Sequence, residues 1–164
     1  MRTYIYSVLS IISMGVVLQA YAQPASDKPA LQKEGKKDTA AQEVKYRKAS
    51  FQMIKYHFRP LGAMVKGKAP FNSATAKANA DALVTLSQFP LNGFQSKSIT
   101  DKSTSLPKIW EDWDGFTKEM TAFQKATENM SQNTSSLEAL KTAFTETAKT
   151  CKSCHKNYRK KKKK

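Results

Sequence analysis

The chain has 164 residues and a formal net charge of +15, with 28 Lys and Arg against 13 Asp and Glu. That length suits one domain around one hydrophobic core and excludes several large domains. A charge this high for the size has three possible explanations: solubility, attraction to an acidic redox partner, or attraction to an anionic membrane surface. Composition alone does not decide among them.

The first 22 residues have the pattern of a secretory signal. Arg2 supplies a charged start, an apolar run extends from Val8 to Leu18, and Ala20 and Ala22 provide small residues at the cleavage positions. As a membrane anchor the run is too short, because a spanning helix needs ~20 apolar residues. We therefore expect export to the periplasm with cleavage near Ala22. A protein in that compartment is not expected to bind nucleic acid.

Two basic segments flank the part of the chain that has helical periodicity. Residues 23–39 combine lysines with Pro and Ala and show no apolar period, while residues 160–164 are an unbroken lysine tail. Like charges repel and neither segment has apolar surface to bury, so we expect both to be solvated and flexible. The folded domain is then expected to occupy residues 40–159.

The first helix is predicted from about Ala40 to Val65. Its apolar residues recur as the a and d positions of a heptad, which indicates one continuous buried seam. The seam consists of Val44, Phe51, Ile54, Phe58, Leu61 and Val65.

A second helix is expected after a turn at Gly67 and Pro70, with Asn72 or Ser73 as its N-cap and an end at Pro90. Its apolar positions are Ala76, Ala80, Leu83 and Leu86.

A polar connection from about Leu91 to Ser105 leads to a third helix, with Pro107 in its first turn. The apolar stripe of this helix is Ile109, Trp113, Phe116, Met120, Phe123, Thr127 and Met130. A last helix is predicted to begin near Ser135 or Ser136. Its seam is Leu137, Leu140, Phe144, Cys151 and Tyr158. Four helices with these connections predict an all-α fold, an antiparallel four-helix bundle.

The only two cysteines stand in the motif Cys151-Lys152-Ser153-Cys154-His155. Two thiols three positions apart on a helix can each add to a vinyl group of one haem, and the adjoining histidine can coordinate its iron. A structural disulfide or a redox-active pair is the alternative, but the histidine and the export signal favour haem. The sequence thus predicts one covalent haem c, attached by Cys151 and Cys154, with His155 as the iron ligand and the haem as part of the core.

Arg47 occupies a seam position at which the period predicts an apolar side chain. Its stem could pack on the core while the guanidinium reaches solvent at the helix end. Alternatively, its planar fork could pair with a haem propionate, which is the interpretation we favour.

These residues resemble the cytochrome c′ family, the class II c-type cytochromes, over almost the whole chain after the signal. The resemblance rests on Val44-Lys45-Tyr46-Arg47, the segment from Gly62 to Phe71, Lys77-Ala78-Asn79, Leu83 to Leu86, Pro107-Lys108-Ile109-Trp110, and Cys151 to His155 with Tyr158-Arg159. It implies a periplasmic four-helix bundle, usually a homodimer through the first two helices. It also implies a five-coordinate, high-spin haem that binds nitric oxide and carbon monoxide, with roles in nitric oxide tolerance and electron transfer.

The residue on the distal face decides between branches of this family. In low-spin relatives resembling cytochrome c-556, a methionine of the first helix binds the iron, and the resemblance places that position at Phe51. A phenyl ring cannot ligate, Met53 lies about 200° round the helix from Phe51, and Met64 is off the strict seam. We therefore expect Phe51 to cover an open iron site. The alternative is a low-spin His/Met electron carrier.

Four further residues are expected to bind the cofactor. The resemblance places Lys48 at the haem edge and Thr104 near a loop position that touches the haem, and Phe116 belongs to the core stripe of the third helix. Arg159 follows His155 by one helical turn and could lie beside the proximal face, or it could be a surface charge.

Two classes of function remain. A gas-binding protein needs a displaceable lid, which Phe51 supplies, and an electron carrier needs a partner surface, for which the basic charge suits an acidic redox protein. No acid or base can be placed over the iron, so we do not expect an enzyme.

Overall fold

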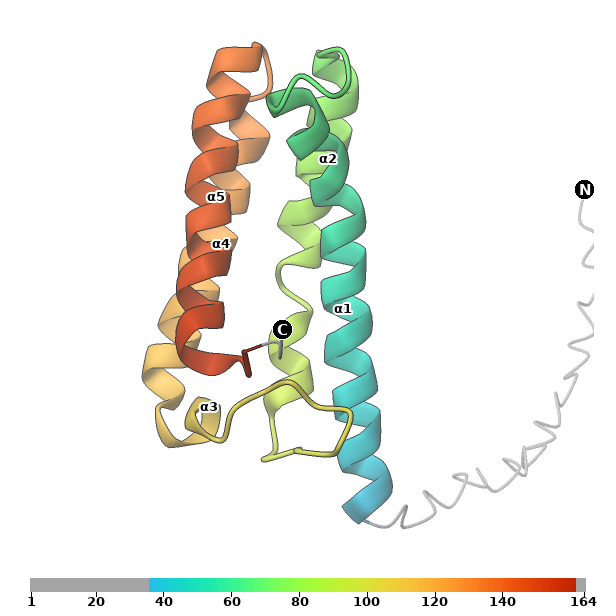
Figure 1. Cartoon of the computed structure of the whole chain (residues 1–164), viewed down its shortest axis with the longest axis vertical. Coiled ribbons are helices and arrows are strands. Elements are labelled where there is room, and N and C mark those ends of the chain that lie inside the picture. The colour runs from blue at the N-terminus through green and yellow to red at the C-terminus, as the bar shows by residue number, and fades with distance from the viewer. Residues whose placement is uncertain (1–35, 162–164) are drawn as a thin grey trace, which may run out of the picture. The chain divides into compact units, whose positions relative to one another are not determined.

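The structure, a computed structural model, describes residues 36–161 (Figure 1). The predicted signal peptide, most of the basic segment 23–39 and the end of the lysine tail 160–164 lie outside the described residues. In the described part the regular structure is helical apart from one isolated bridge between Ser105 and Arg159. None of the helices described is both long and apolar enough to cross a bilayer.

Four long helices form the predicted antiparallel bundle. They are α1 (Lys36–Val65), α2 (Ser73–Leu86), α4 (Trp113–Gln132) and α5 (Leu137–Tyr158). The connection from α2 to α4 contains a 3₁₀ turn, η1 (Pro90–Phe94), and the short helix α3 (Lys108–Glu111). Helix α1 contacts α2 and α5, and α4 contacts the same two helices, so the bundle is closed. Successive long helices run in opposite directions (Figure 1).

Local chemistry explains where these helices begin and end. Gly67 has φ +66°, and the Lys68 amide donates to the Ala63 carbonyl at 2.8 Å, which is a Schellman end for α1. The Asn72 side chain accepts from the Thr75 amide and caps α2, as predicted. Ser136 caps α5 in the same way. Helix α1 begins at Lys36 rather than near Ala40, so the helical part of the chain reaches into the segment expected to be flexible.

The core consists of two apolar clusters stacked along the bundle. The first cluster includes Ile54, Leu61, Met64, Leu83, Phe123, Met130 and Leu140, and the second consists of Phe94, Ile109, Phe116, Met120 and Tyr158. Phe51 packs against both clusters, while Cys151 packs against the first and Cys154 against the second. The two cysteines therefore lie where the clusters meet.

The structure corrects three details of the sequence analysis. The third helix is divided at Asp112, whose φ of −130° and ψ of 57° end α3 and start α4, and Pro107 precedes α3 as its N-cap. The connection expected to be polar includes η1, with Phe94 buried. Leu137 is 41% exposed, because it begins α5 beyond the core.

Candidate functional site

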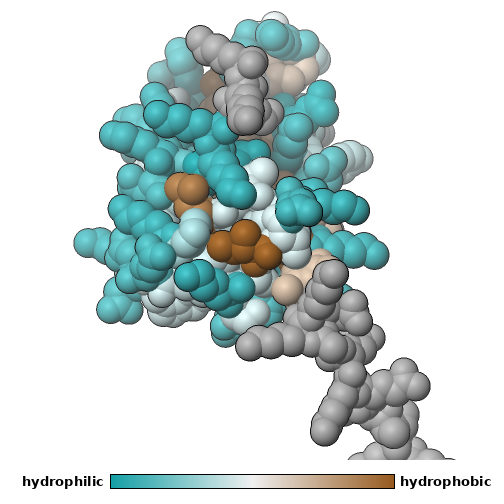
Figure 2. Space-filling view, turned by 60° about the horizontal axis from the view of Figure 1, so that its bottom comes forward, coloured by the Kyte–Doolittle hydropathy of each residue, from teal (hydrophilic) through white to brown (hydrophobic). Residues whose placement is uncertain are grey.

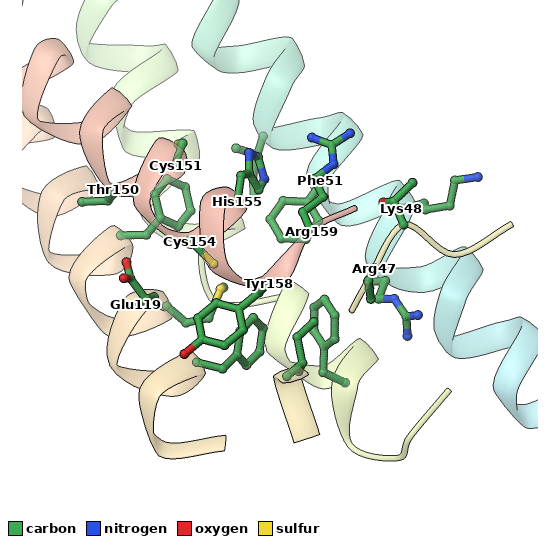
Figure 3. Close-up of a pocket in the computed structure, with 18 of the residues that line it drawn as sticks. Arg47, Lys48, Phe51, Glu119, Thr150, Cys151, Cys154, His155, Tyr158 and Arg159 are labelled. Carbon is green, nitrogen blue, oxygen red and sulfur yellow. The ribbon is translucent and has the colours of Figure 1, made fainter. Parts of the chain in front are cut away.

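A cavity of about 590 Å³ is lined by residues of α1, α4 and α5, by Phe94 of η1 and Ile109 of α3, and by the segment 103–105. Its wall is mainly apolar, and every residue that the sequence analysis assigned to the cofactor or the metal contributes to it. These residues are Arg47, Lys48, Phe51, Thr104, Phe116, Cys151, Cys154, His155 and Arg159. Most of them are labelled in Figure 3. A cavity of this size and polarity is typical of a site for a cofactor or another small molecule.

Both thiols are free, half-buried and on the wall of the cavity. Burial raises the pKa of Cys151, and burial together with the charges of Glu119 and Cys151 raises the pKa of Cys154 to about 12. A thioredoxin-like nucleophile requires the opposite shift, because it attacks as a thiolate. The redox-pair alternative is thus disfavoured by the electrostatics of the site.

His155 lies across the cavity from Phe51. The centroids of the two rings are 6.5 Å apart and their planes make an angle of 66°. The two rings form a tilted, edge-to-face pair on the cavity wall, so a side chain without a ligating atom lies next to the imidazole. Burial, with a smaller effect of Arg159, lowers the pKa of His155 and favours the neutral imidazole that a metal ligand requires.

Among the described residues, the methionine that lines the cavity belongs to α4 and not to α1. Met53 is 43% exposed, as the helical period predicts. Met64 is 5% exposed and packs in the first core cluster, away from the cavity. Met120, which the sequence analysis treated only as core, is the single methionine among the described residues that lines the cavity. Periodicity could not reveal this, because a cavity wall and a packed core have the same apolar pattern.

Arg47 is buried with 3% of its surface exposed, so the interpretation in which its guanidinium reaches solvent is wrong. Its Nη1 donates to the Gly93 carbonyl and to Ser98 Oγ at 2.9 and 2.5 Å. Its Nη2 donates to the Ser98 carbonyl and to Ser103 Oγ at 2.5 and 2.9 Å. Arg47 therefore holds the segment from Gly93 to Ser103 against α1 at the edge of the cavity.

The charge of Arg47 has no carboxylate in ion-pair contact among the described residues. Burial lowers the pKa of Arg47, and the charge of Glu43 opposes that shift without forming an ion pair. An anion at the cavity edge would compensate this buried cation. A haem propionate would be such an anion, but both Nη groups of Arg47 already donate to the segment from Gly93 to Ser103, so the two-point pairing stays a prediction.

The end of α5 is fixed by a clasp of three residues, Asp112, Gly115 and Tyr158, which the sequence analysis did not identify. Tyr158 donates its phenol to Asp112 Oδ2 at 2.7 Å, and Asp112 Oδ1 accepts from the Gly115 amide at 3.2 Å. A Cβ on Gly115 would lie 2.5 and 2.6 Å from the Asp112 carboxylate oxygens and 2.6 Å from the Tyr158 hydroxyl, so a larger residue there would force the clasp to shift. The Tyr158 carbonyl also accepts from the Leu106 amide. The clasp thereby holds the turn that follows His155.

A further hydrogen bond joins the predicted haem-attachment motif, Cys151 to His155, to α4. Ser153, between the two cysteines, donates to Glu119 Oε1 at 2.7 Å. Glu119 lines the cavity and was not among the predicted site residues. Its partner lies 34 positions away in sequence, and no local pattern signals that contact.

The residues present fit a haem c. Two thiols and an imidazole lie on one cavity wall, an aromatic ring faces the imidazole, and a buried cation without an ion-paired carboxylate lies at the edge. Thiols for covalent attachment, imidazole for iron and a cation for a propionate are the donor types that this cofactor needs.

Comparison with known proteins identifies the family. The family model described as Cytochrome C′ matches residues 42–159. The cytochrome c′ of Alcaligenes xylosoxydans xylosoxydans is 36% identical over 121 residues, which cover 73% of this chain and 94% of that protein. The solved structure of cytochrome c prime from Shewanella frigidimarina is 39% identical, with a TM-score of 0.72 over 74% of this chain and 97% of that one. The nitric oxide complex of a leucine-to-alanine variant from Alcaligenes xylosoxidans is 34% identical, with a TM-score of 0.70 over 75% and 97% of the two chains.

Proposed function

The chain belongs to the cytochrome c′ family, whose members carry one covalently bound haem c, and from this premise we propose that it is a gas-binding haem protein of the periplasm. The haem would be five-coordinate and high-spin, would bind nitric oxide and carbon monoxide and would take part in electron transfer. The observation that carries the proposal is the position of Phe51, a side chain without a ligating atom, across the cavity from His155.

We assign attachment to Cys151 and Cys154, which present their thiols on the wall of one cavity, and iron ligation to His155. When bound, the haem supplies an iron centre that can take a diatomic ligand and exchange one electron. The clasp holds the turn after His155, and Arg47 holds the segment that closes the cavity edge. These contacts would orient the imidazole and exclude water without a catalytic group, so we propose ligand binding rather than catalysis.

Phe51 would control access of the gas. Its ring packs against both core clusters and lies beside His155, so a diatomic molecule would have to displace the ring to reach an iron held by that histidine. Moving a packed aromatic ring costs part of the ~1.5–3 kcal/mol gained by its burial. Small neutral ligands would therefore bind slowly because of this ring alone, without a polar residue that controls their entry.

A stripe on the outer face of α1 supports the homodimer expected for the family. Tyr46, Met53 and Tyr56 recur at intervals of seven and three, so they share one side of the helix. Their side chains are 42%, 43% and 73% exposed. An exposed apolar stripe of this kind fits a second copy of the helix, and we propose that two subunits pair through α1.

The test is the absorption spectrum of the mature chain, produced with the haem-attachment machinery, in ferric and ferrous forms with and without carbon monoxide. We expect high-spin spectra and a marked shift with carbon monoxide. A low-spin spectrum indifferent to carbon monoxide would contradict the proposal and indicate a His/Met electron carrier. In that event Met120→Leu should restore the high-spin spectrum, since Met120 is the methionine described on the cavity wall.

A further inference from the structure

The positive charge of this protein is segregated along the sequence. Residues 44–80 contain eight Lys and Arg and no Asp or Glu, and residues 147–164 likewise have basic residues but no acidic ones. The first segment supplies most of α1, and the second supplies the end of α5 with the attachment motif. These helices contact each other in the bundle, so the fold combines two acid-free segments into one surface.

The cavity opens within that surface. On α1, Lys48, Lys55 and Arg59 lie at intervals of seven and four and share one side, next to the core seam. On α5, Lys152 and Lys156 lie one turn apart beside His155, and Arg159 is the extended residue that directly follows the helix. Lys48, Lys55 and Arg159 line the cavity itself, while the other three of these six residues are exposed. We call the six residues the basic face.

Neighbouring acids do not neutralise the basic face. The ion pair found among the described residues joins Lys77 to Asp81, on another part of the surface. Glu119 is the single acidic residue on the cavity wall, and it accepts a hydrogen bond from Ser153. The end of the molecule that holds α3 and the end of α5, brought forward in Figure 2, shows mostly hydrophilic side chains around small hydrophobic spots. Unneutralised charge around a cofactor opening attracts an oppositely charged molecule and speeds its encounter.

We propose that the basic face docks an acidic one-electron carrier protein over the cavity that holds the haem. This proposal rests on the proposed function, because it needs haem in that cavity. The reaction makes and breaks no bond: the carrier's metal loses one electron and the ferric haem iron gains it, or the reverse.

An acidic protein fits the basic face better than an anionic membrane does. Surfaces that lie in a bilayer interface combine basic residues with large apolar side chains that insert among the lipids. On α1 the exposed apolar residues Tyr46, Met53 and Tyr56 lie on a different side of the helix from Lys48, Lys55 and Arg59. On α5 the exposed apolar residue is Leu137, at the opposite end of the helix from Lys152 and Lys156.

The experiment measures electron exchange of the holoprotein with an acidic blue-copper protein by stopped flow, at increasing salt. Arg59→Gln combined with Lys156→Gln removes two exposed charges from the basic face, neither of them on the cavity wall. Lys118→Gln combined with Lys125→Gln removes two exposed charges from α4 and is the matched control. At ~10 mM ionic strength we expect the first pair to slow the reaction about three- to tenfold and the control pair by less than about twofold. At ~0.5 M the difference should disappear, because salt screens the charges.

Small reagents provide a second measure, which depends on charge alone. Oxidation of the ferrous protein by anionic ferricyanide should slow in the first pair, whereas oxidation by a cationic cobalt tris-phenanthroline complex should speed up. If the rates change equally in both pairs, the net charge of the protein alone determines them, and the basic face is not a docking surface. Binding to vesicles that contain phosphatidylserine is the competing explanation. If the first pair loses that binding but exchanges electrons with the copper protein at an unchanged rate, the basic face binds a membrane and the proposal is overturned.

Failure of the docking proposal is distinguishable from failure of the proposed function. Carbon monoxide is neutral, so its binding should be unchanged in both pairs. Normal carbon monoxide binding without a rate difference between the pairs would leave the gas-binding function standing and remove the docking surface. If the first pair loses its haem spectrum, Lys152→Gln removes another charge of the face, which also lies off the cavity wall.

Discussion

At the scale of single residues, we expect Phe51 to have the most direct effect on the proposed function. We expect Phe51→Ala to increase the association rate of carbon monoxide by about 10- to 100-fold, because the ~1.5–3 kcal/mol held in packing of the ring no longer opposes entry. Stopped-flow mixing of the ferrous protein with carbon monoxide measures this rate. Phe89→Ala is the control, since Phe89 is exposed and does not line the cavity. An unchanged rate in Phe51→Ala would show that the ring does not limit access.

Tyr158 gives the protein a predicted alkaline pH dependence. Burial and the hydrogen bond to Asp112 raise the pKa of Tyr158 to about 12 from an ordinary value of 10.0. A raised pKa means that the unfolded chain loses this proton first, so the stabilisation is complete below pH ~10 and is lost between pH ~10 and ~12. Urea unfolding of the holoprotein across that range should show this loss, and Tyr158→Phe should remove it. In the holoprotein the two cysteines are thioethers, so their thiols do not contribute.

At the scale of helices, the clasp depends on a glycine inside α4. Alanine normally stabilises a helix relative to glycine by ~1 kcal/mol. We nevertheless expect Gly115→Ala to destabilise the protein by about 1–3 kcal/mol, because the added methyl collides with Asp112 and with the Tyr158 hydroxyl. Urea unfolding measures the change, and Thr121→Ala on the exposed side of α4 is the control. A gain in stability at position 115 would mean that the clasp relaxes without cost.

Periodicity predicted the helices well and the contacts between them poorly. The seam of α1, the caps at Asn72 and Ser136 and the attachment motif follow from residues close in sequence, so the pattern was sufficient. The break at Asp112 was hidden because the apolar stripe continues across it in register. The partners of Arg47 lie 46 to 56 positions away, and that of Tyr158 lies 46 away, so these contacts depend on the packing of the whole bundle.

At the scale of the whole molecule, the haem should be part of the fold. A porphyrin buries several hundred Å² of apolar surface, which at ~25 cal/mol/Å² is comparable with the ~5–15 kcal/mol net stability of a domain. We expect Cys151→Ser combined with Cys154→Ser to unfold at lower urea concentration and less cooperatively than the holoprotein, as measured by circular dichroism. The unchanged chain made without the attachment machinery is the control, since it lacks haem but keeps both thiols. Equal stability of all three forms would show that the two apolar clusters suffice.

Dimerisation combines an apolar attraction with a charge repulsion, so it should depend on salt. Without the predicted signal, which contains Arg2 and no other charged residue, each subunit carries +14, one less than the +15 of the full chain. Salt screens that repulsion and leaves the attraction between the exposed stripes of α1 intact. We expect sedimentation to show mainly monomer at ~10 mM ionic strength and a growing share of dimer at ~0.5 M.

The position of the stripe makes this last prediction specific. Tyr56→Lys adds one charge at the most exposed residue of the stripe and should keep the protein monomeric at both salt concentrations. Lys118→Gln removes a charge from the exposed side of α4 and should favour the dimer slightly, through net charge alone. If Tyr56→Lys dimerises like the unmodified protein, the subunits do not pair through this face of α1. Because the stripe and the basic face are different sides of α1, pairing would leave the cavity opening accessible to a redox partner.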